Sequence, residues 1–246
     1  MKNTELLSFA SDDELAARAA GAWLDEIESA NRAGKTHCVA LSGGRIVQKF
    51  FAASVEQTEK RAISFGRVRF FWADERCVPP TDPESNFKPA NELLFAPLEI
   101  PAVQIHRIRG EDSPQAAAKI AEEELRRIVS ANKNRQPVLD LVFLGMGEDG
   151  HIASLFPGTT GLAAALDPDG ARLAIGVELA GLAPYVPRIS LTGRALLDAK
   201  LIVLLTGGAP KRVLIERALT DPAFSAPVSA LLRQTRAPVR LLWSPT

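Results

Sequence analysis

Two apolar runs in the second half of the chain, at residues 139–144 and 201–205, lack the regular alternation of polar and apolar residues. Strands with one face in solvent alternate, whereas strands buried on both faces in parallel sheets do not. Helical periodicities separate these runs from the other strand-like segments, so strands and helices alternate along the chain. The sequence therefore predicts an α/β protein with a Rossmann-like, doubly wound and mainly parallel sheet flanked by helices.

Several helix boundaries can be predicted from local signals. Ser11 and Glu14 form a capping-box pattern at the start of a helix over 11–30, which ends at Gly34. Ser113 and Pro114 have the residue types of an N-cap and a first helical position for a helix over 114–132. The other predicted helices are 45–57 and 211–219, and the predicted strands are 36–44, 67–72, 138–145, 172–179, 188–192, 200–208 and 237–243.

The segment 79–101 is rich in proline and polar residues and lies between a predicted strand and a predicted helix. Long loops in compact chains are more often functional than idle, so a functional insertion is predicted here. The sequence contains no internal repeat, low-complexity tract or linker. A single domain over residues 1–246 is therefore expected.

Composition narrows the possible partners. The chain has 246 residues, 46% hydrophobic and 24% charged, which is the balance of a soluble globular protein. Its formal net charge is zero, which argues against nucleic acid or an anionic membrane surface as a partner but allows a local basic pocket. The N-terminus lacks the apolar core of a signal peptide, and no apolar run reaches the roughly 18 residues of a membrane span. A cytoplasmic protein is expected, with a monomer favoured.

Cysteines and histidines are few. Cys38 lies in an apolar run and is expected to be buried, and Cys77 follows a charged run without a second nearby cysteine. Neither a disulfide framework nor a cysteine-based zinc site is predicted. His37, His106 and His151 are far apart in sequence and do not form a metal-binding motif, so no metal site is expected.

The carboxyl ends of parallel strands meet at one edge of an open sheet, where ligands bind. The first loop at this edge contains Ser42, Gly43 and Gly44 and opens a helix. Free N–H groups at such a turn attract anions, although an ordinary strand-to-helix turn has the same composition. Arg45 opposes the helix dipole, which is explained either by contact with a bound anion or by exposure to solvent.

Two further loops at the same edge carry ionisable residues. Asp74 and Arg76 directly follow the strand predicted at 67–72. In "GMGEDGHIASLFPG" at 145–158, glycines permit a tight path, and Asp149 and His151 are close enough in sequence for their side chains to converge. A carboxylate beside an imidazole fixes the tautomer of the ring, although a histidine in such a turn can also be purely structural.

Two basic residues complete the set of candidates. Arg188 begins the predicted strand 188–192, and Lys211 follows a glycine turn at the start of a helix. An arginine offers a phosphate group two parallel hydrogen bonds, and a lysine offers a point charge. Taken singly, each residue is better explained as a surface charge that increases solubility.

Together these motifs resemble those of the 6-phosphogluconolactonase family. The matching segments, in the family's order, are "SGG" at 42–44, "DERCVPPTDPESN" at 74–86, "GMGEDGHIASLFPG" at 145–158, "PRISLT" at 187–192 and "GGAPK" at 207–211. The resemblance implies hydrolysis of 6-phospho-D-glucono-1,5-lactone to 6-phospho-D-gluconate, a step of the oxidative pentose phosphate pathway. It also implies a fold shared with glucosamine-6-phosphate deaminases, and no required cofactor.

A mechanism consistent with these residues uses neutral His151 as a general base toward water, oriented by Asp149 or by another carboxylate of these loops, such as Asp74. Arg76 is the candidate for holding substrate oxygens near the lactone carbonyl. The candidates for binding the phosphate group or the substrate near it are Ser42, Gly43, Gly44, Arg45, Arg188 and Lys211.

Two positions depart from the family's pattern. The turn "SGGSTP", usual in the family, is here "SGGRIV", which removes a hydroxyl group and a proline next to the expected anion site. Ile152 stands where the family usually has a threonine after the histidine. The first change bears on anion binding, and the second removes a hydroxyl group without altering Asp149 or His151.

Two other functions fit parts of the pattern. A glucosamine-6-phosphate deaminase would share the Asp-Gly-His turn, but its motif typically continues "AFNEPG", whereas this chain continues "ASLFPG" and lacks the glutamate. A non-catalytic phosphosugar sensor domain would retain the phosphate-binding residues alone. No additional DNA-binding module is evident in the sequence, and the presence of both Asp149 and His151 favours an enzyme.

Overall fold

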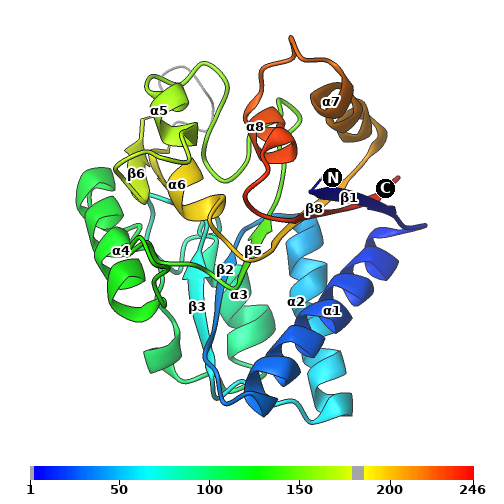
Figure 1. Ribbon diagram of the computed structural model, residues 1–246. Coiled ribbons are helices and arrows are strands. Elements are labelled where there is room, and N and C mark those ends of the chain that lie inside the picture. Colours follow the sequence, from blue (N-terminus) through cyan, green and yellow to red (C-terminus); the bar gives the residue numbers. More distant parts are fainter. Residues whose placement is uncertain (1–2, 179–185) are drawn as a thin grey trace.

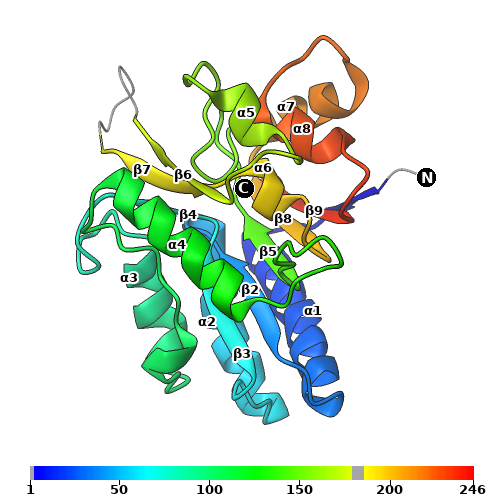
Figure 2. The same ribbon diagram turned by 60° about the vertical axis from the view of Figure 1, so that its left-hand side comes forward.

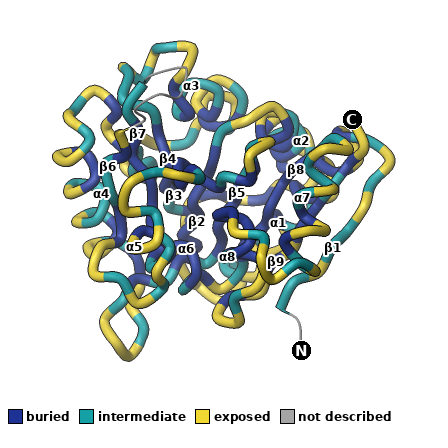
Figure 3. Tube along the Cα trace, turned by 90° about the horizontal axis from the view of Figure 1, so that it is seen from above, coloured by how far each residue is buried: buried dark blue, intermediate teal, exposed yellow. Residues whose placement is uncertain are grey.

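The computed structural model describes residues 3–178 and 186–246. Six strands form a sheet in the order β1-β9-β8-β5-β2-β3, and every neighbouring pair in it is parallel (Figure 1). Figure 3 shows that the central strands are buried while the periphery is exposed. The predicted parallel α/β sheet is thus confirmed. Its strands are β1 (Thr4–Ser8), β2 (His37–Leu41), β3 (Val68–Trp72), β5 (Leu141–Leu144), β8 (Ile202–Gly207) and β9 (Val239–Ser244).

Helices α1 (Asp12–Arg32) and α2 (Arg45–Arg61) contact each other and the large sheet. The predicted start of α1 is confirmed, because the Ser11 hydroxyl accepts a hydrogen bond from the Glu14 N–H at 3.2 Å. The Glu14 carboxylate accepts the Ala10 N–H at 2.8 Å, so the reciprocal bond of the capping box is made one residue earlier than usual. Gly34, at φ 65°, follows α1 as predicted.

The core between these helices and the sheet is built around Trp23. Its ring centroid lies 5.3 Å from that of Phe50, 5.5 Å from Phe65 and 5.8 Å from Phe143. Tilted and edge-on aromatic pairs at these separations stabilise a core beyond the burial of area alone. The cluster fixes α1 and α2 against the sheet, and therefore fixes the loop between β2 and α2.

A second sheet was not predicted. Its three antiparallel strands are arranged in the order β4-β7-β6, with α4 packed along it (Figure 2). The strands predicted at 172–179 and 188–192 belong to this sheet and not to the parallel one. Leu179, the last residue of the first of these predicted strands, lies outside the described residues. The prediction of a polar loop directly after β3 is wrong. The members are β4 (Asp74–Arg76), β6 (Ala174–Val177), β7 (Arg188–Leu191) and α4 (Pro114–Ile128).

The segment 79–101 is only partly the loop that was predicted. Its second half is helical, with α3 (Phe87–Ala90) continuing into a π-helical turn, η1 (Asn91–Phe95). Leu94 and Phe95 are buried in the core. Prolines at 79, 80 and 83 dominate the composition of the first half, which hides the helix that follows.

The remaining elements are short or lie near the C-terminus. The helix predicted at 211–219 is α7 (Ala209–Thr220), and the Ser113 cap of α4 is confirmed by a 3.4 Å hydrogen bond from the Ala116 N–H. No helix within 3–178 or 186–246 is long and apolar enough to cross a membrane. Besides β1, β4, α3 and η1, the elements that were not predicted from the sequence are η2 (Ala102–Gln104), α5 (Leu162–Leu166), α6 (Gly193–Leu196) and α8 (Pro227–Arg233).

Candidate active site

A cavity of about 210 Å³ opens at the carboxyl edge of the large sheet, between the loops that follow β2 and β5. After β2 the chain proceeds outward to β3, whereas β5 lies on the other side of β2, so the strand order reverses here. Loops that diverge at such a switch point leave a crevice for ligand. Nine of the ten predicted site residues line the cavity: Ser42, Gly43, Gly44, Arg45, Asp74, Arg76, His151, Arg188 and Lys211.

The tenth residue, Asp149, does not line the cavity but holds His151, which does. Oδ1 of Asp149 lies 2.6 Å from Nδ1 of the imidazole and accepts the backbone N–H of His151 at 3.0 Å. Burial opposes ionisation of Asp149, but these hydrogen bonds outweigh it and hold the pKa of the carboxyl below its ordinary value. An ionised carboxylate only accepts hydrogen bonds, so in the neutral imidazole Nδ1 carries the proton and Nε2 keeps its lone pair.

Gly147 makes room for this pair. A Cβ atom at this position would come within 2.6 Å of Asp149 Oδ1 and would overlap the imidazole of His151. The loop closes on itself, because the Gly147 N–H donates to the His151 carbonyl at 3.0 Å and the Gly150 N–H to the Gly147 carbonyl at 3.1 Å. A residue without a side chain is required where the loop passes this close to the ring.

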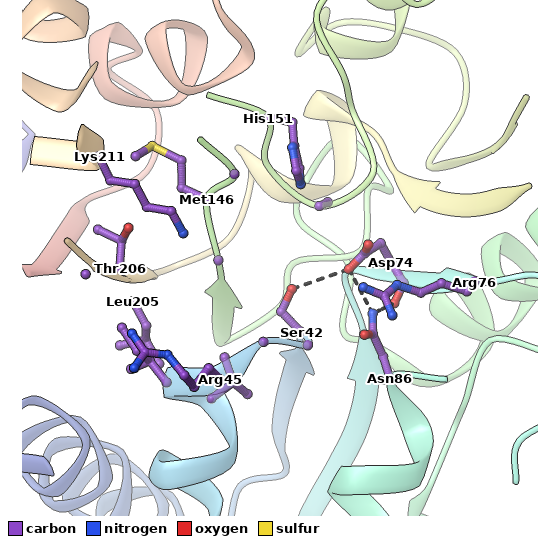
Figure 4. A pocket seen from close by; sticks show the side chains of 18 of the residues that line it. Ser42, Arg45, Asp74, Arg76, Asn86, Met146, His151, Leu205, Thr206 and Lys211 are labelled. Carbon is purple, nitrogen blue, oxygen red and sulfur yellow. Dashed lines mark hydrogen bonds between the residues drawn. The ribbon is translucent and has the colours of Figure 1, made fainter. Parts of the chain in front are cut away.

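Asp74 is buried at the opposite side of the pocket in Figure 4 from Lys211, and three side chains hold it in place. Its Oδ2 accepts the Ser154 hydroxyl at 2.6 Å, and its Oδ1 accepts the Ser42 hydroxyl at 3.4 Å and the Asn86 amide at 3.3 Å. These bonds join β4 to the loops after β2, β4 and β5 in one network. Buried carboxylates are stable only when hydrogen-bonded in this way.

Glu75 and Asn86 are two residues that sequence reasoning did not assign to the site. Glu75 is buried, and its carboxylate accepts the backbone N–H groups of Arg76, Asn86 and Phe87 and the hydroxyl of Ser85. Burial raises the pKa of Glu75 against the effect of these bonds. These hydrogen bonds to Glu75 place Asn86 in the cavity wall against Gly43, where a Cβ atom on the glycine would overlap the amide.

Arg76 and Arg188 face each other across β4 and β7 as partners in register. Arg188 is 9% exposed, and within the described residues neither guanidinium forms an ion pair with a carboxylate. Burial, and after it the charge of Arg76, lowers the pKa of Arg188. Directly opposed like charges destabilise a sheet unless an anion lies between them, so this pair is suited to an anionic ligand.

Phe156 contacts both Arg188 and His151. Its ring centroid lies 4.2 Å from that of the His151 imidazole and 5.3 Å from the guanidinium carbon of Arg188. An aromatic face attracts a cation that is short of other partners. The phenyl ring therefore restricts two pocket side chains at once, a role that the motif "SLFPG" does not reveal by itself.

Lys211 lies in the first turn of α7 and points into the cavity, with Thr206 near it (Figure 4). Burial lowers the pKa of Lys211, the charge of Glu148 raises it, and the charge of Arg45 lowers it further. The Thr206 hydroxyl is buried and has no hydrogen-bond partner among the described residues. The sequence assigned no role to this hydroxyl, although the glycine turn before Lys211 placed its segment at the ligand-binding edge.

The structure shows the surroundings of Arg45 and Ile152, the two positions that depart from the family pattern. Arg45 lines the cavity and forms an ion pair with Asp12, with 3.2 Å between Nη2 and Oδ2. Ile152 is buried in the hydrophobic core and does not line the cavity. The side chain at position 152 therefore does not belong to the cavity wall.

The remaining histidines and both cysteines lie elsewhere. His37 is buried at the opposite end of β2, and Nδ1 of His106 pairs with Glu124 at 3.0 Å. Burial raises the pKa of Cys38 to about 12 and of Cys77 to about 11, so both are thiols at neutral pH. No group of three or more potential metal-binding side chains occurs in the part of the chain that the structure describes.

The fold and the pocket are those of an α/β protein whose cavity gathers basic side chains beside a histidine–aspartate pair. The family model described as glucosamine-6-phosphate isomerases/6-phosphogluconolactonase matches residues 10–243, and the chain belongs to this family. The resemblance drawn from the sequence motifs is thereby confirmed.

Individual relatives are similar over most of their length. The 6-phosphogluconolactonase of Haemophilus influenzae is 37% identical over 192 residues, which cover 78% of this chain and 77% of the relative. That of Rhizobium meliloti is 31% identical over 245 residues, covering 99% and 97%. The solved structure of 6-phosphogluconolactonase from Trypanosoma brucei superposes with a TM-score of 0.83 at 26% identity, covering 99% of this chain and 97% of that one.

Proposed function

We propose that this chain hydrolyses 6-phospho-D-glucono-1,5-lactone to 6-phospho-D-gluconate, with His151 as the general base. The observation that carries the proposal is the hydrogen bond of 2.6 Å between Asp149 and Nδ1 of His151, beside a cavity lined by Arg76 and Arg188, neither of which pairs with a carboxylate of the described residues. A δ-lactone needs an attacking water, stabilisation of the developing oxyanion and a proton for the departing ring oxygen. The lining of this cavity contains a group suited to each of these needs.

His151 supplies the proton transfers. Because Asp149 holds the proton on Nδ1, the free lone pair of Nε2 accepts a proton from water as the oxygen attacks the carbonyl. The same nitrogen then returns that proton to the ring oxygen as the C–O bond breaks. The imidazole ends each turnover neutral, and the carboxylate stabilises the imidazolium that exists between the two transfers.

The cationic residues divide between the two ends of the substrate. Arg188, Lys211 and the N–H groups of Gly43 and Gly44 hold the phosphate group. Arg76 holds oxygens near the lactone carbonyl and stabilises the charge that develops there. Binding of the remote phosphate fixes the carbonyl for attack by water. Asp74 orders the loops that carry these groups, through Ser42, Ser154 and Asn86.

The test is an assay in which glucose-6-phosphate dehydrogenase generates the lactone in place. The rate without the protein is subtracted, because an activated ester also hydrolyses spontaneously. We expect turnover by the wild-type protein and no ammonia from glucosamine 6-phosphate, which a deaminase would release. His151→Gln keeps a polar side chain of similar size and should lower kcat by about 100-fold or more with Tm preserved, the usual contribution of a general base. Wild-type turnover by a folded His151→Gln protein would disprove the assignment.

The proposal also covers the domain organisation, partners, location and oligomeric state of the protein. Residues 1–246 act as one domain on a small phosphorylated lactone, without a nucleic-acid or membrane partner, in the cytoplasm and as a monomer. Residues from α2, β4, β7, β8 and α7, and from the loops after β2 and β5, all contribute to a single cavity, which supports one functional unit. Sedimentation equilibrium would show a mass above the 26.5 kDa of the chain if the monomer assignment were wrong.

A further inference from the structure

The ion pair between Asp12 and Arg45 joins the first turns of α1 and α2 at the rim of the pocket. The Asp12 side chain is 2% exposed and that of Arg45 is 69% exposed. Oδ1 of Asp12 accepts the hydroxyls of Ser244 and Thr246, whereas Oδ2 is buried without a hydrogen bond. Within the described residues, Arg45 is the one cation that pairs with this carboxylate. The carboxylate is therefore tied to the C-terminal strand on one side and directs a guanidinium on the other.

An arginine at this place works against the local electrostatics. It begins α2, where the helix dipole disfavours a cation, and no acidic residue occupies the first turn of that helix. Arg45 also lines the same cavity as Lys211, and Figure 4 shows both on the same side of the pocket, away from Arg76. Burial is the main cause that lowers the pKa of Lys211; the charge of Glu148 raises this pKa, and the charge of Arg45 lowers it by a smaller amount. Two cations that repel each other at one end of a cavity favour a multiply charged anion between them.

We propose that Arg45 is a phosphate-recognising residue at the rim of the pocket and that Asp12 is the positioning residue that fixes its guanidinium. This inference rests on the proposed function of the same pocket. In this chain, Arg45 takes the place of the small hydroxyl residue that is usual after the glycines. A guanidinium reaches further than a hydroxyl, so the buried carboxylate is needed to hold it next to the phosphate instead of in open solvent.

Lys49 provides a matched control for Arg45. It lies on α2 one turn after Arg45 and pairs with Asp13 of α1 at 2.7 Å, so the same two helices carry a second ion pair. Lys49 does not line the cavity. Arg45→Gln and Lys49→Gln remove the same charge from the same helix. We expect Arg45→Gln to raise KM for the phosphorylated lactone about threefold to fivefold, the size of an exposed charge contact, with kcat within about twofold of the wild type.

The same comparison separates phosphate recognition from a general charge effect. Lys49→Gln should leave KM unchanged, and neither variant should alter hydrolysis of unphosphorylated gluconolactone. An equal rise in KM for Lys49→Gln, or an unchanged KM for Arg45→Gln, would overturn the role of Arg45.

The role of Asp12 is tested by a double-mutant cycle. In an Asp12→Asn background the guanidinium is no longer fixed, so Arg45→Gln should change KM by less than about twofold. The asparagine keeps an oxygen for the Ser244 hydroxyl, and Tm shows whether the variant folds. If it does not fold, Asp12→Glu keeps the charge and displaces the carboxylate, and the effect of Arg45→Gln should again differ from that in the wild type. The same factor in both backgrounds would show that Asp12 does not position Arg45.

Calorimetric titration with inorganic phosphate separates this inference from the proposed function. If the wild-type protein does not hydrolyse the lactone, the proposed function is refuted. The phosphate affinities of the variants would still show whether Arg45 contacts phosphate. Weaker phosphate binding by Arg45→Gln than by Lys49→Gln supports the inference. Equal binding by the two variants overturns it.

Discussion

Replacement of Asp149 by asparagine tests the central interaction of the site. Asp149→Asn has nearly the same shape but removes the charge that holds the proton on Nδ1 of His151. The asparagine amide can donate to Nδ1, which would place the imidazole proton on Nε2, where it blocks acceptance of a proton from water. The fold is expected to survive, because Asp149 lies in a turn outside the core and its side chain is 46% exposed.

The magnitude follows from the geometry of the pair. A hydrogen bond to a charged group contributes about 1.5–3 kcal/mol, and solvent screening favours the lower half of this range here, since the His151 side chain is also 27% exposed. A loss of about 1.5–2 kcal/mol from transition-state stabilisation corresponds to a fall in kcat of about 10- to 30-fold. KM should change little, because the phosphate contacts come from other elements.

The assay is the coupled lactone assay, run at several pH values with Glu148→Gln as the control. Glu148 is the neighbouring exposed carboxylate and makes no hydrogen bond within the described residues, so this variant removes the same charge without touching His151. Burial opposes ionisation of Asp149, but the hydrogen bonds from His151 keep its pKa below the ordinary value. The carboxylate is thus charged throughout the neutral range, and the stability it contributes is lost only as the pH falls into the acid range. The reasoning is refuted if folded Asp149→Asn stays within twofold of wild-type kcat, or if Glu148→Gln loses as much.

Three further substitutions test the backbone around the site and one helix end. Gly147→Ala places a Cβ atom against the His151 imidazole, and overpacking of this kind costs about 1–3 kcal/mol. The imidazole should move to avoid the Cβ atom, so kcat in the same assay should fall by about tenfold or more. Gly43→Ala places a Cβ atom against the Asn86 amide, so urea unfolding should show a loss of about 1–3 kcal/mol in stability and the assay a higher KM. Ala62 ends α2 in the left-handed region at φ 51°, and Ala62→Gly should raise the free energy of unfolding by about 0.5–1 kcal/mol with kcat unchanged. A neutral or destabilising effect of Ala62→Gly would show that this strain is absorbed elsewhere.

The sequence predicted the parallel sheet and its ligand-binding edge because both have local signals. Strands buried on two faces are apolar throughout, and glycine turns follow their carboxyl ends. These features placed Gly43, His151 and Lys211 at one edge before any contact was known, and all three line one cavity. The helix starts at Ser11 and Ser113 were predictable for the same reason, since a cap needs only the few residues around it.

The second sheet and the cross-links of the site could not be predicted in this way. Asp74, Glu75 and Arg76 are as polar as loop residues, and they form a strand because buried partners take the place of water around their side chains. Ser154, which holds Asp74, is 80 residues away in sequence, so no periodicity connects them.

What the sequence alone determined is the set of chemical groups and the edge of the sheet at which they gather, because hydrophobic burial and turn chemistry act over a few neighbouring residues. Only the tertiary structure decided which of these groups meet. It placed Phe156 against both His151 and Arg188, and it set Arg45 against the buried carboxylate of Asp12. Such contacts depend on how distant segments pack, and packing is fixed only when the whole core forms.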